Sequence, residues 1–273
     1  MPSTLNLRPR CLQVRGHLRW LGVALLPLSA CAERTPTESD APPPLVVHAM
    51  LGAGSAEQTV LVEEARRLSD GFFFGVTPAS GAVVTVSGPA EHRFVEDPGQ
   101  PGTYRGTFTP QAGARYSLQV QGARGQEIAG EATVPEPFGF RTPSRDTATA
   151  PEDSAVLRWS RSPSAAGYIL LWRRVDRSGA SSANEILQSA TPWVNPDTTV
   201  AVNVRNAGVL HGLVDTLRFT VAAVDENFRN YVLTEDQVAP DGSRSRFRTT
   251  VRGGYGLFGA YAISDSRVIG VRK

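Results

Sequence analysis

The chain has 273 residues, of which 20% are charged and 41% are hydrophobic, with 26 glycines and 20 prolines. This composition is typical of a turn-rich globular protein and argues against a disordered chain or a multi-span membrane protein. Two cysteines are too few for a disulfide framework, and the single lysine, Lys273, leaves none for a Walker phosphate loop.

The formal net charge of +2 comes from the amino-terminal segment. Residues 1–30 contain four arginines and no acidic residue, and the remainder has 24 basic against 26 acidic side chains. Nucleic-acid binding requires clustered positive charge, and the remainder has no basic run. We therefore expect no nucleic-acid partner.

The amino terminus has the organisation of a targeting segment. Basic residues up to Arg19 are followed by the apolar run 21–28, which is too short for a bilayer span of about 20 residues. Residues 28–31 read LSAC and resemble the bacterial lipobox. We therefore predict that residues 1–30 are a lipoprotein signal peptide.

The lipobox resemblance implies that the thiol of Cys31 takes a diacylglycerol, that the peptide is cut before it, and that the new amino group is acylated. Two or more acyl chains anchor a protein stably to a membrane. Ala32 stands where inner-membrane lipoproteins often carry Asp, which implies the outer membrane. The alternatives are a secretory peptide cleaved near Ala30 or a buried thiol. Cys11 would leave with the peptide.

Residues 31–44 are dominated by Pro, Ser, Thr and acidic residues and show no apolar periodicity. We predict a disordered, semi-extended tether. From residue 45 the apolar period is two, and turn residues interrupt it often, so we expect a β-sandwich over 45–137. Its predicted strands are 45–50, 59–63, 82–86, 103–108, 116–121 and 126–134.

A boundary rich in Pro, Ser and Thr follows at 135–154, and a second sandwich is expected over 150–273. The segment around Trp159 and Tyr168 resembles a fibronectin type III module, in which these two aromatics pack across the core. The predicted strands are 155–159, 168–172, 200–204 and 217–223, with one short helix at 182–189. The predicted fold class is therefore all-β, with two immunoglobulin/fibronectin-like sandwiches in tandem.

The order of motifs along the chain is also similar to a bacterial outer-membrane lipoprotein family known as a domain of unknown function. The similarity rests on the lipobox, 78–86, 113–118, 132–135 and the glycine-rich stretch 253–260. Members of that family often lie beside TonB-dependent outer-membrane transporters. The resemblance thus implies a TonB-dependent outer-membrane transporter as the partner, and it supplies no site residues.

Residues suited to catalysis or metal binding do not form known motifs. His48, His92 and His211 lack zinc-ligand spacing, and no Gly-x-Ser-x-Gly elbow occurs. The acidic stretch 225–227 follows a strand, where it is either a solvated turn, which we favour, or a calcium loop. We expect no catalytic residue, no metal and no cofactor, and we interpret His48 as a half-buried strand residue.

Three consecutive aromatics, Phe72, Phe73 and Phe74, cannot all face one core if the chain there is extended. They are either an exposed contact for a partner protein or sugar, or a bulged strand that buries two of them. Trp193, between Pro192 and 194–196, is a weaker case of the same kind. These four aromatics are the candidate partner contacts.

The glycine-rich run 253–259 is followed by strand-like sequence, so it lacks the helix that a phosphate-binding loop requires. We interpret it as a bulged final strand whose glycines permit close packing against another surface, for which the first sandwich is a candidate.

The sequence as a whole favours a non-enzymatic, lipid-anchored lipoprotein of the bacterial outer membrane. Its expected role is that of an accessory or ligand-contacting module of an envelope transporter or complex, with the membrane contacted through amino-terminal acyl chains. A glycan-binding surface lipoprotein is the alternative, and an envelope hydrolase or a structural spacer are further ones.

Overall fold

The structure is a computed structural model. It describes residues 41–66, 77–141, 147–149, 154–175, 188–189, 197–203, 216–235 and 248–272. All of these belong to one compact unit, Ala41–Lys273. No helix within these ranges has the length and apolar content that a membrane crossing needs.

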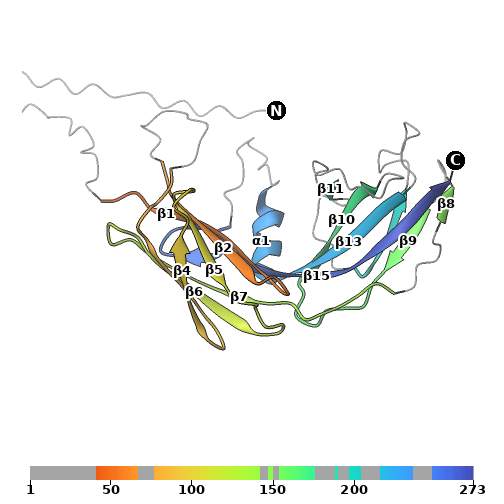
Figure 1. The fold of residues 1–273 in the computed structure, drawn as a ribbon, viewed down its shortest axis with the longest axis horizontal. Helices are drawn as coiled ribbons and strands as arrows, with labels where there is room; N and C mark the ends of the chain where they lie inside the picture. Colours follow the sequence, from red (N-terminus) through yellow and green to blue (C-terminus); the bar gives the residue numbers. More distant parts are fainter. Residues whose placement is uncertain are drawn as a thin grey trace, which may run out of the picture. The chain divides into compact units, whose positions relative to one another are not determined.

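The described residues form fifteen strands and one short helix, which confirms the all-β prediction (Figure 1). They contain two separate hydrophobic cores, as expected for two sandwich-like bodies in tandem. The strands are β1 (Leu45–Gly52), β2 (Glu57–Glu64), β3 (Val83–Ser87), β4 (Glu91–Glu96), β5 (Thr103–Thr107), β6 (Arg115–Gln121), β7 (Glu127–Thr133), β8 (Thr147–Thr149), β9 (Ser154–Arg158), β10 (Gly167–Val175), β11 (Gln188–Ser189), β12 (Thr199–Asn203), β13 (Thr216–Val224), β14 (Val251–Arg252) and β15 (Tyr255–Arg272).

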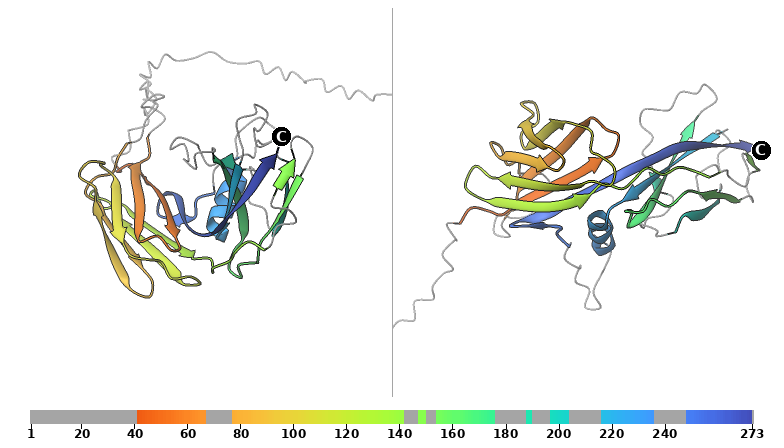
Figure 2. Two further views of the ribbon diagram at one scale, coloured as in Figure 1. Left: turned by 45° about the vertical axis from the view of Figure 1, so that its right-hand side comes forward. Right: turned by 90° about the horizontal axis from the view of Figure 1, so that it is seen from below.

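Most of these strands belong to one continuous hydrogen-bonded series. Its order is β11-β10-β13-β15-β1-β2-β5-β4-β3-β6-β7-β14, with β8 beside β15, while β9 and β12 form a separate pair. Figure 2 shows β1 and β2 on one side of the first body and β6 and β7 on the other. The first core lies between them.

Strand β6 shows how the sequence builds this core. Tyr116, Leu118 and Val120 are buried, while Gln119 and Gln121 between and beyond them are exposed. Side chains alternate between the two faces of a strand, so period-two sequence buries one face and leaves the other in water. Burying each such aliphatic side chain contributes about 1.5–3 kcal/mol.

The second core contains the aromatic pair that the fibronectin type III resemblance implies. Trp159 and Tyr168 are both buried, and their ring centroids lie 5.6 Å apart in an edge-to-face arrangement. Leu157 and Phe219 pack in the same cluster. Edge-to-face geometry sets the positive rim of one ring against the negative face of the other, which stabilises the pair beyond its area burial.

The last strand belongs to both bodies, which differs from the expected assignment of 150–273 to the second one. β15 pairs in parallel with β1 over Tyr255–Tyr261 and antiparallel with β13 from Tyr261 to Gly270. Phe258 therefore lies in the first core and Ile269 in the second. The chain thus passes between the two cores three times, through 134–141, through 225–250 and along β15.

Glycine permits the close approach of β15 to β1, as the interpretation of the glycine run requires. Gly256 has a φ of 113°, and a Cβ there would lie 2.0 Å from the carbonyl oxygen of Val47. That φ is one that side-chain-bearing residues rarely adopt, and that distance is shorter than any real contact. No other residue fits at position 256 without moving one of the two strands.

The one described helix, α1 (Glu226–Glu235), was not expected. The amide of Phe228 donates a 3.0 Å hydrogen bond to Oδ1 of Asp225, which is the N-cap geometry. Asp225 is 3% exposed, so the interpretation of 225–227 as a solvated turn is wrong at its first residue. Of the helix predicted at 182–189, only Gln188 and Ser189 are described, and they form β11.

Candidate functional site

The residues predicted to act in anchoring or partner contact all lie outside the described residues. They are Cys31, Phe72, Phe73, Phe74 and Trp193. The signal peptide and the tether up to residue 40 also lie outside. Their roles remain predictions.

The described histidines are engaged in packing. His48 is half-buried in β1, as predicted, with its ring edge-on to Tyr231 of α1 at a centroid distance of 6.3 Å. His92 stacks on Phe108 at 3.9 Å. Among the described residues, no three His, Cys, Asp or Glu side chains gather as metal ligands would.

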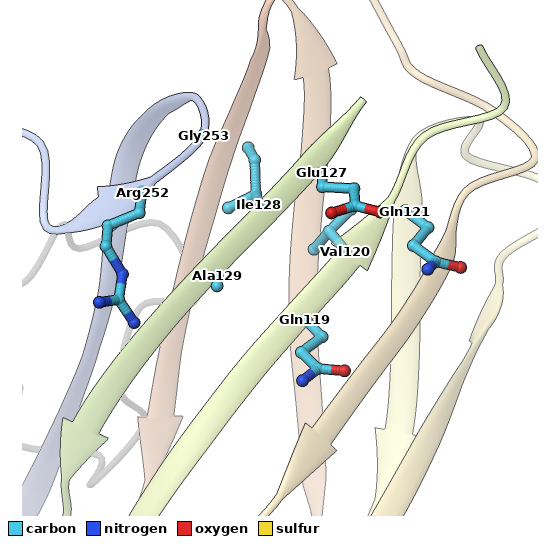
Figure 3. Close-up of a pocket in the computed structure, with 8 residues that line it drawn as sticks. All are labelled: Gln119, Val120, Gln121, Glu127, Ile128, Ala129, Arg252 and Gly253. Atoms are coloured by element: carbon cyan, nitrogen blue, oxygen red, sulfur yellow. The ribbon is translucent and has the colours of Figure 1, made fainter. Parts of the chain in front are cut away.

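An open depression of about 340 Å³ lies on the outer face of β6, β7 and β14 (Figure 3). Gln119 and Gln121 of β6, Glu127 and Ala129 of β7 and Arg252 of β14 line it. The floor is the backbone of β6 and β7, since the side chains of the intervening residues point into the first core. The small side chain at position 129 leaves the space between the polar groups open.

The polar side chains of this depression have no bonding partners within the described part of the chain. Within the described part of the chain, Gln119, Gln121, Glu127 and Arg252 form no side-chain hydrogen bond and no ion pair. All four are exposed. They offer two carboxamides, one carboxylate and one guanidinium to a ligand from solution.

Several other arginines on the first body are paired. Arg105 pairs with Glu57 and with Asp97, the latter at 2.9 Å, and Arg115 pairs with Glu131. Such exposed pairs contribute little to stability, but they occupy both partners. Among the described residues Arg252 has no such partner, so its guanidinium is available at the depression.

A second cavity, of about 370 Å³, adjoins Asp225. Burial raises the pKa of the Asp225 carboxyl to about 6, although backbone amides of Phe228, Ala260 and Thr133 donate to it and oppose the rise. The carboxyl thus joins α1, β15 and the end of β7. Asn227 reinforces the same joint, because its amide nitrogen donates to the carbonyl of Phe258 at 2.8 Å.

The remaining polar groups around this second cavity are bonded to one another. Arg115 pairs with Glu131, and Ser164 donates its amide and its hydroxyl to Glu136. These two bonds hold the pKa of the Glu136 carboxyl below its usual value. The groups are satisfied within the chain, so we assign the second cavity a structural role and take the first depression as the candidate site.

Sequence reasoning did not identify this candidate site, although it predicted the strand that carries part of it. The alternation of 116–121 placed Gln119 and Gln121 on a solvent face. It did not bring Arg252 beside them, because β14 pairs with β7 across more than a hundred residues of chain. The signal available was the hairpin around Gly253, which turns β14 back toward β15.

Residues 33–267 match the sequence profile of a family described as "Domain of unknown function (DUF4249)". No curated protein matches the chain in sequence.

Three of the solved structures similar to the chain are described here. The FN1-FN3 domains of chicken CNTN1 are 14% identical with a TM-score of 0.35, covering 85% of this chain and 69% of that one. The BSP domain of a biofilm associated protein is 10% identical with a TM-score of 0.24, covering 84% and 30%. A Ca²⁺-stabilized adhesin that helps an Antarctic bacterium bind ice is 11% identical with a TM-score of 0.22, covering 85% and 49%. At these values the similarities add nothing to the fold already described.

Proposed function

The chain belongs to the DUF4249 family, whose description assigns no activity, and from its own residues we propose that it is a lipid-anchored lipoprotein of the bacterial outer membrane. It acts without catalysis, as an accessory or ligand-contacting module of an envelope transporter or complex. The observation that carries the proposal is the LSAC motif at 28–31, placed directly after a basic stretch and a short apolar run.

The tether supports the same proposal. Residues 31–44 contain four prolines, and β1 begins at Leu45. Proline-rich segments are semi-rigid spacers with about 3.1 Å per residue, so the segment separates an acylated Cys31 from the β-body by up to about 40 Å. Such a spacer leaves the surfaces of the body accessible beside a membrane.

The anchoring step is tested by replacing Cys31 with Ala in cells that make the full chain. We expect the variant to leave the outer-membrane fraction and to lose incorporation of a labelled fatty acid, since no other acylation site is proposed. Cys11→Ala is the matched control, because Cys11 leaves with the signal peptide, and it should behave like the parent protein. Unchanged membrane retention and labelling of the Cys31 variant would refute the proposal.

The partner we propose is a TonB-dependent outer-membrane transporter, in line with the family resemblance, and the proposed contacts are Phe72, Phe73, Phe74 and Trp193. Replacing the three phenylalanines by Ser should reduce recovery of the transporter with the tagged chain from gently solubilised envelopes. The Cys11→Ala protein again serves as the control. Equal recovery from both proteins would remove these aromatics from the interface.

A further inference from the structure

The polar groups of the depression on β6, β7 and β14 form two rows across the strands. Gln119, Ala129 and Arg252 are register partners in one row, and Gln121 and Glu127 are partners in the next. Two residues separate the rows along each strand, which corresponds to about 6.8 Å. The carboxylate and the guanidinium therefore stand in different rows, on neighbouring strands.

The two charges are close without being paired. Diagonal neighbours on adjacent antiparallel strands lie about 7–8 Å apart, a distance that long side chains can span. Arg252 and Glu127 nevertheless form no ion pair. A lone anion at Arg252 would be repelled by Glu127, and a lone cation at Glu127 by Arg252, so a ligand that satisfies both groups must carry both charges.

The neighbouring groups indicate what kind of molecule carries those charges. The carboxamides of Gln119 and Gln121 each donate and accept, as a peptide group does. Val83, the register partner of Gln121 on β3, is 41% exposed and adds an apolar surface next to Gln121. Of the described residues, no aromatic side chain lines the depression, so they supply no stacking surface of the kind typical of sugar-binding sites.

We propose that this depression binds an extended polypeptide segment that carries an acidic and a basic side chain two positions apart. In an extended chain, residues i and i+2 face the same way about 6.8 Å apart, which matches the spacing of the two rows. The acidic side chain pairs with Arg252, the basic one with Glu127, and the Gln amides bind the backbone between them. The inference rests on the proposed function in one respect, namely that the segment belongs to an envelope protein.

The test places a photo-cross-linking amino acid at position 119 of the full chain in intact cells. The matched control position is Thr59, an exposed residue of β2 on the outer face of the opposite layer. We expect position 119, and not position 59, to capture a polypeptide, and mass spectrometry to map the cross-link to a segment with an acidic and a basic residue two apart. Arg252→Glu should reduce the yield about tenfold through like-charge repulsion.

A synthetic peptide of the captured segment then separates charge recognition from other causes. Its affinity for the purified chain should fall about tenfold with Arg252→Glu or with Glu127→Arg. The affinity should recover when a variant that carries both Arg252→Glu and Glu127→Arg is combined with a peptide whose acidic and basic residues are exchanged. Ala129→Trp should also abolish binding by filling the depression, whereas Thr59→Trp should not, and unchanged circular dichroism would show that each variant folds.

Several outcomes would overturn the inference. These are no cross-link at position 119, equal capture from position 59, capture of a glycan or lipid, or a segment without the charge pair. This result is independent of the anchoring test. If a segment of the expected kind is cross-linked but the Cys31→Ala protein keeps its membrane retention and labelling, the anchor is rejected and the binding site is kept. The reverse combination would keep the anchor and reject the site.

Discussion

The Asp225 side chain connects the elements between the two cores, but its burial reduces the stability of the folded protein when the carboxyl is ionised. Its carboxyl caps α1 and accepts amides from β15 and β7, but burial raises its pKa from 3.8 to about 6. A carboxyl with a raised folded-state pKa favours the folded state most when it is protonated, below the unfolded-state pKa. This contribution is lost as the pH rises through about 6.

We therefore expect Asp225 to make the protein less stable at pH 7 than at pH 4.5. The rise in pKa from 3.8 to about 6 corresponds to at most about 3 kcal/mol of unfolding free energy. Urea unfolding at the two pH values should show the difference, and Asp225→Asn should reduce it. The control is Glu226→Gln at the exposed neighbouring residue, and its unfolding free energy should keep the pH dependence of the parent protein. An identical pH dependence in the Asp225 variant would contradict this role.

The same residue shows why sequence reasoning was wrong about 225–227. Adjacent acids and an amide after a strand are typical of a turn, and the pattern was interpreted in that way. The overlooked signals were Asp as a preferred N-cap residue and the apolar spacing of Phe228, Tyr231 and Val232, which is that of a helix face. Burial of Asp225 could not be predicted, because it depends on contacts with β7 and β15.

Among the secondary-structure elements, the strands of the first body were largely predictable, whereas for β15 the sequence predicted a bulged final strand but not its length or its pairing with both β1 and β13. In β6 one face is buried and the other is solvated, so its period-two pattern is clear. In β15, residues 256–260 are all buried, with the first core on one face and α1 among the elements in contact with the strand. Burial on both faces removes the alternation on which the prediction depends.

Because β15 contributes to both cores, damage to the first core should weaken the second. Phe258→Ala, in the first core, should cost about 3–5 kcal/mol. Trp159 and Trp172 lie in the second core, so tryptophan fluorescence, with Trp20 and Trp193 replaced by Phe, reports on that core.

The fluorescence transition of the Phe258 variant should shift to lower denaturant together with the far-ultraviolet circular dichroism signal. Val95→Ala is a suitable control, because Val95 is 71% exposed on β4 and its truncation should leave both transitions unchanged. An unshifted tryptophan transition in the Phe258 variant would mean that the two cores unfold independently.

At the largest scale, we propose that the protein combines an amino-terminal targeting segment with a β-body, and the described residues of that body form an uncommitted polar depression on β6, β7 and β14. The sequence alone indicated the address, the tether and the all-β body. It could not indicate the depression as a unit, since Arg252 reaches Ala129 only through the pairing of β14 with β7. The proposed anchoring and the proposed binding therefore depend on residues that are distant in the sequence.

The most direct measurement of the proposed anchoring is the intact mass of the protein purified from envelopes without prior delipidation. We expect a chain that begins at Cys31 and carries a diacylglyceryl group and one further acyl chain, with residues 1–30 absent. A chain that begins at Ala32 or later, or one that retains residues 1–30 with an unmodified thiol at Cys31, would contradict the proposed anchor and the outer-membrane role that depends on it.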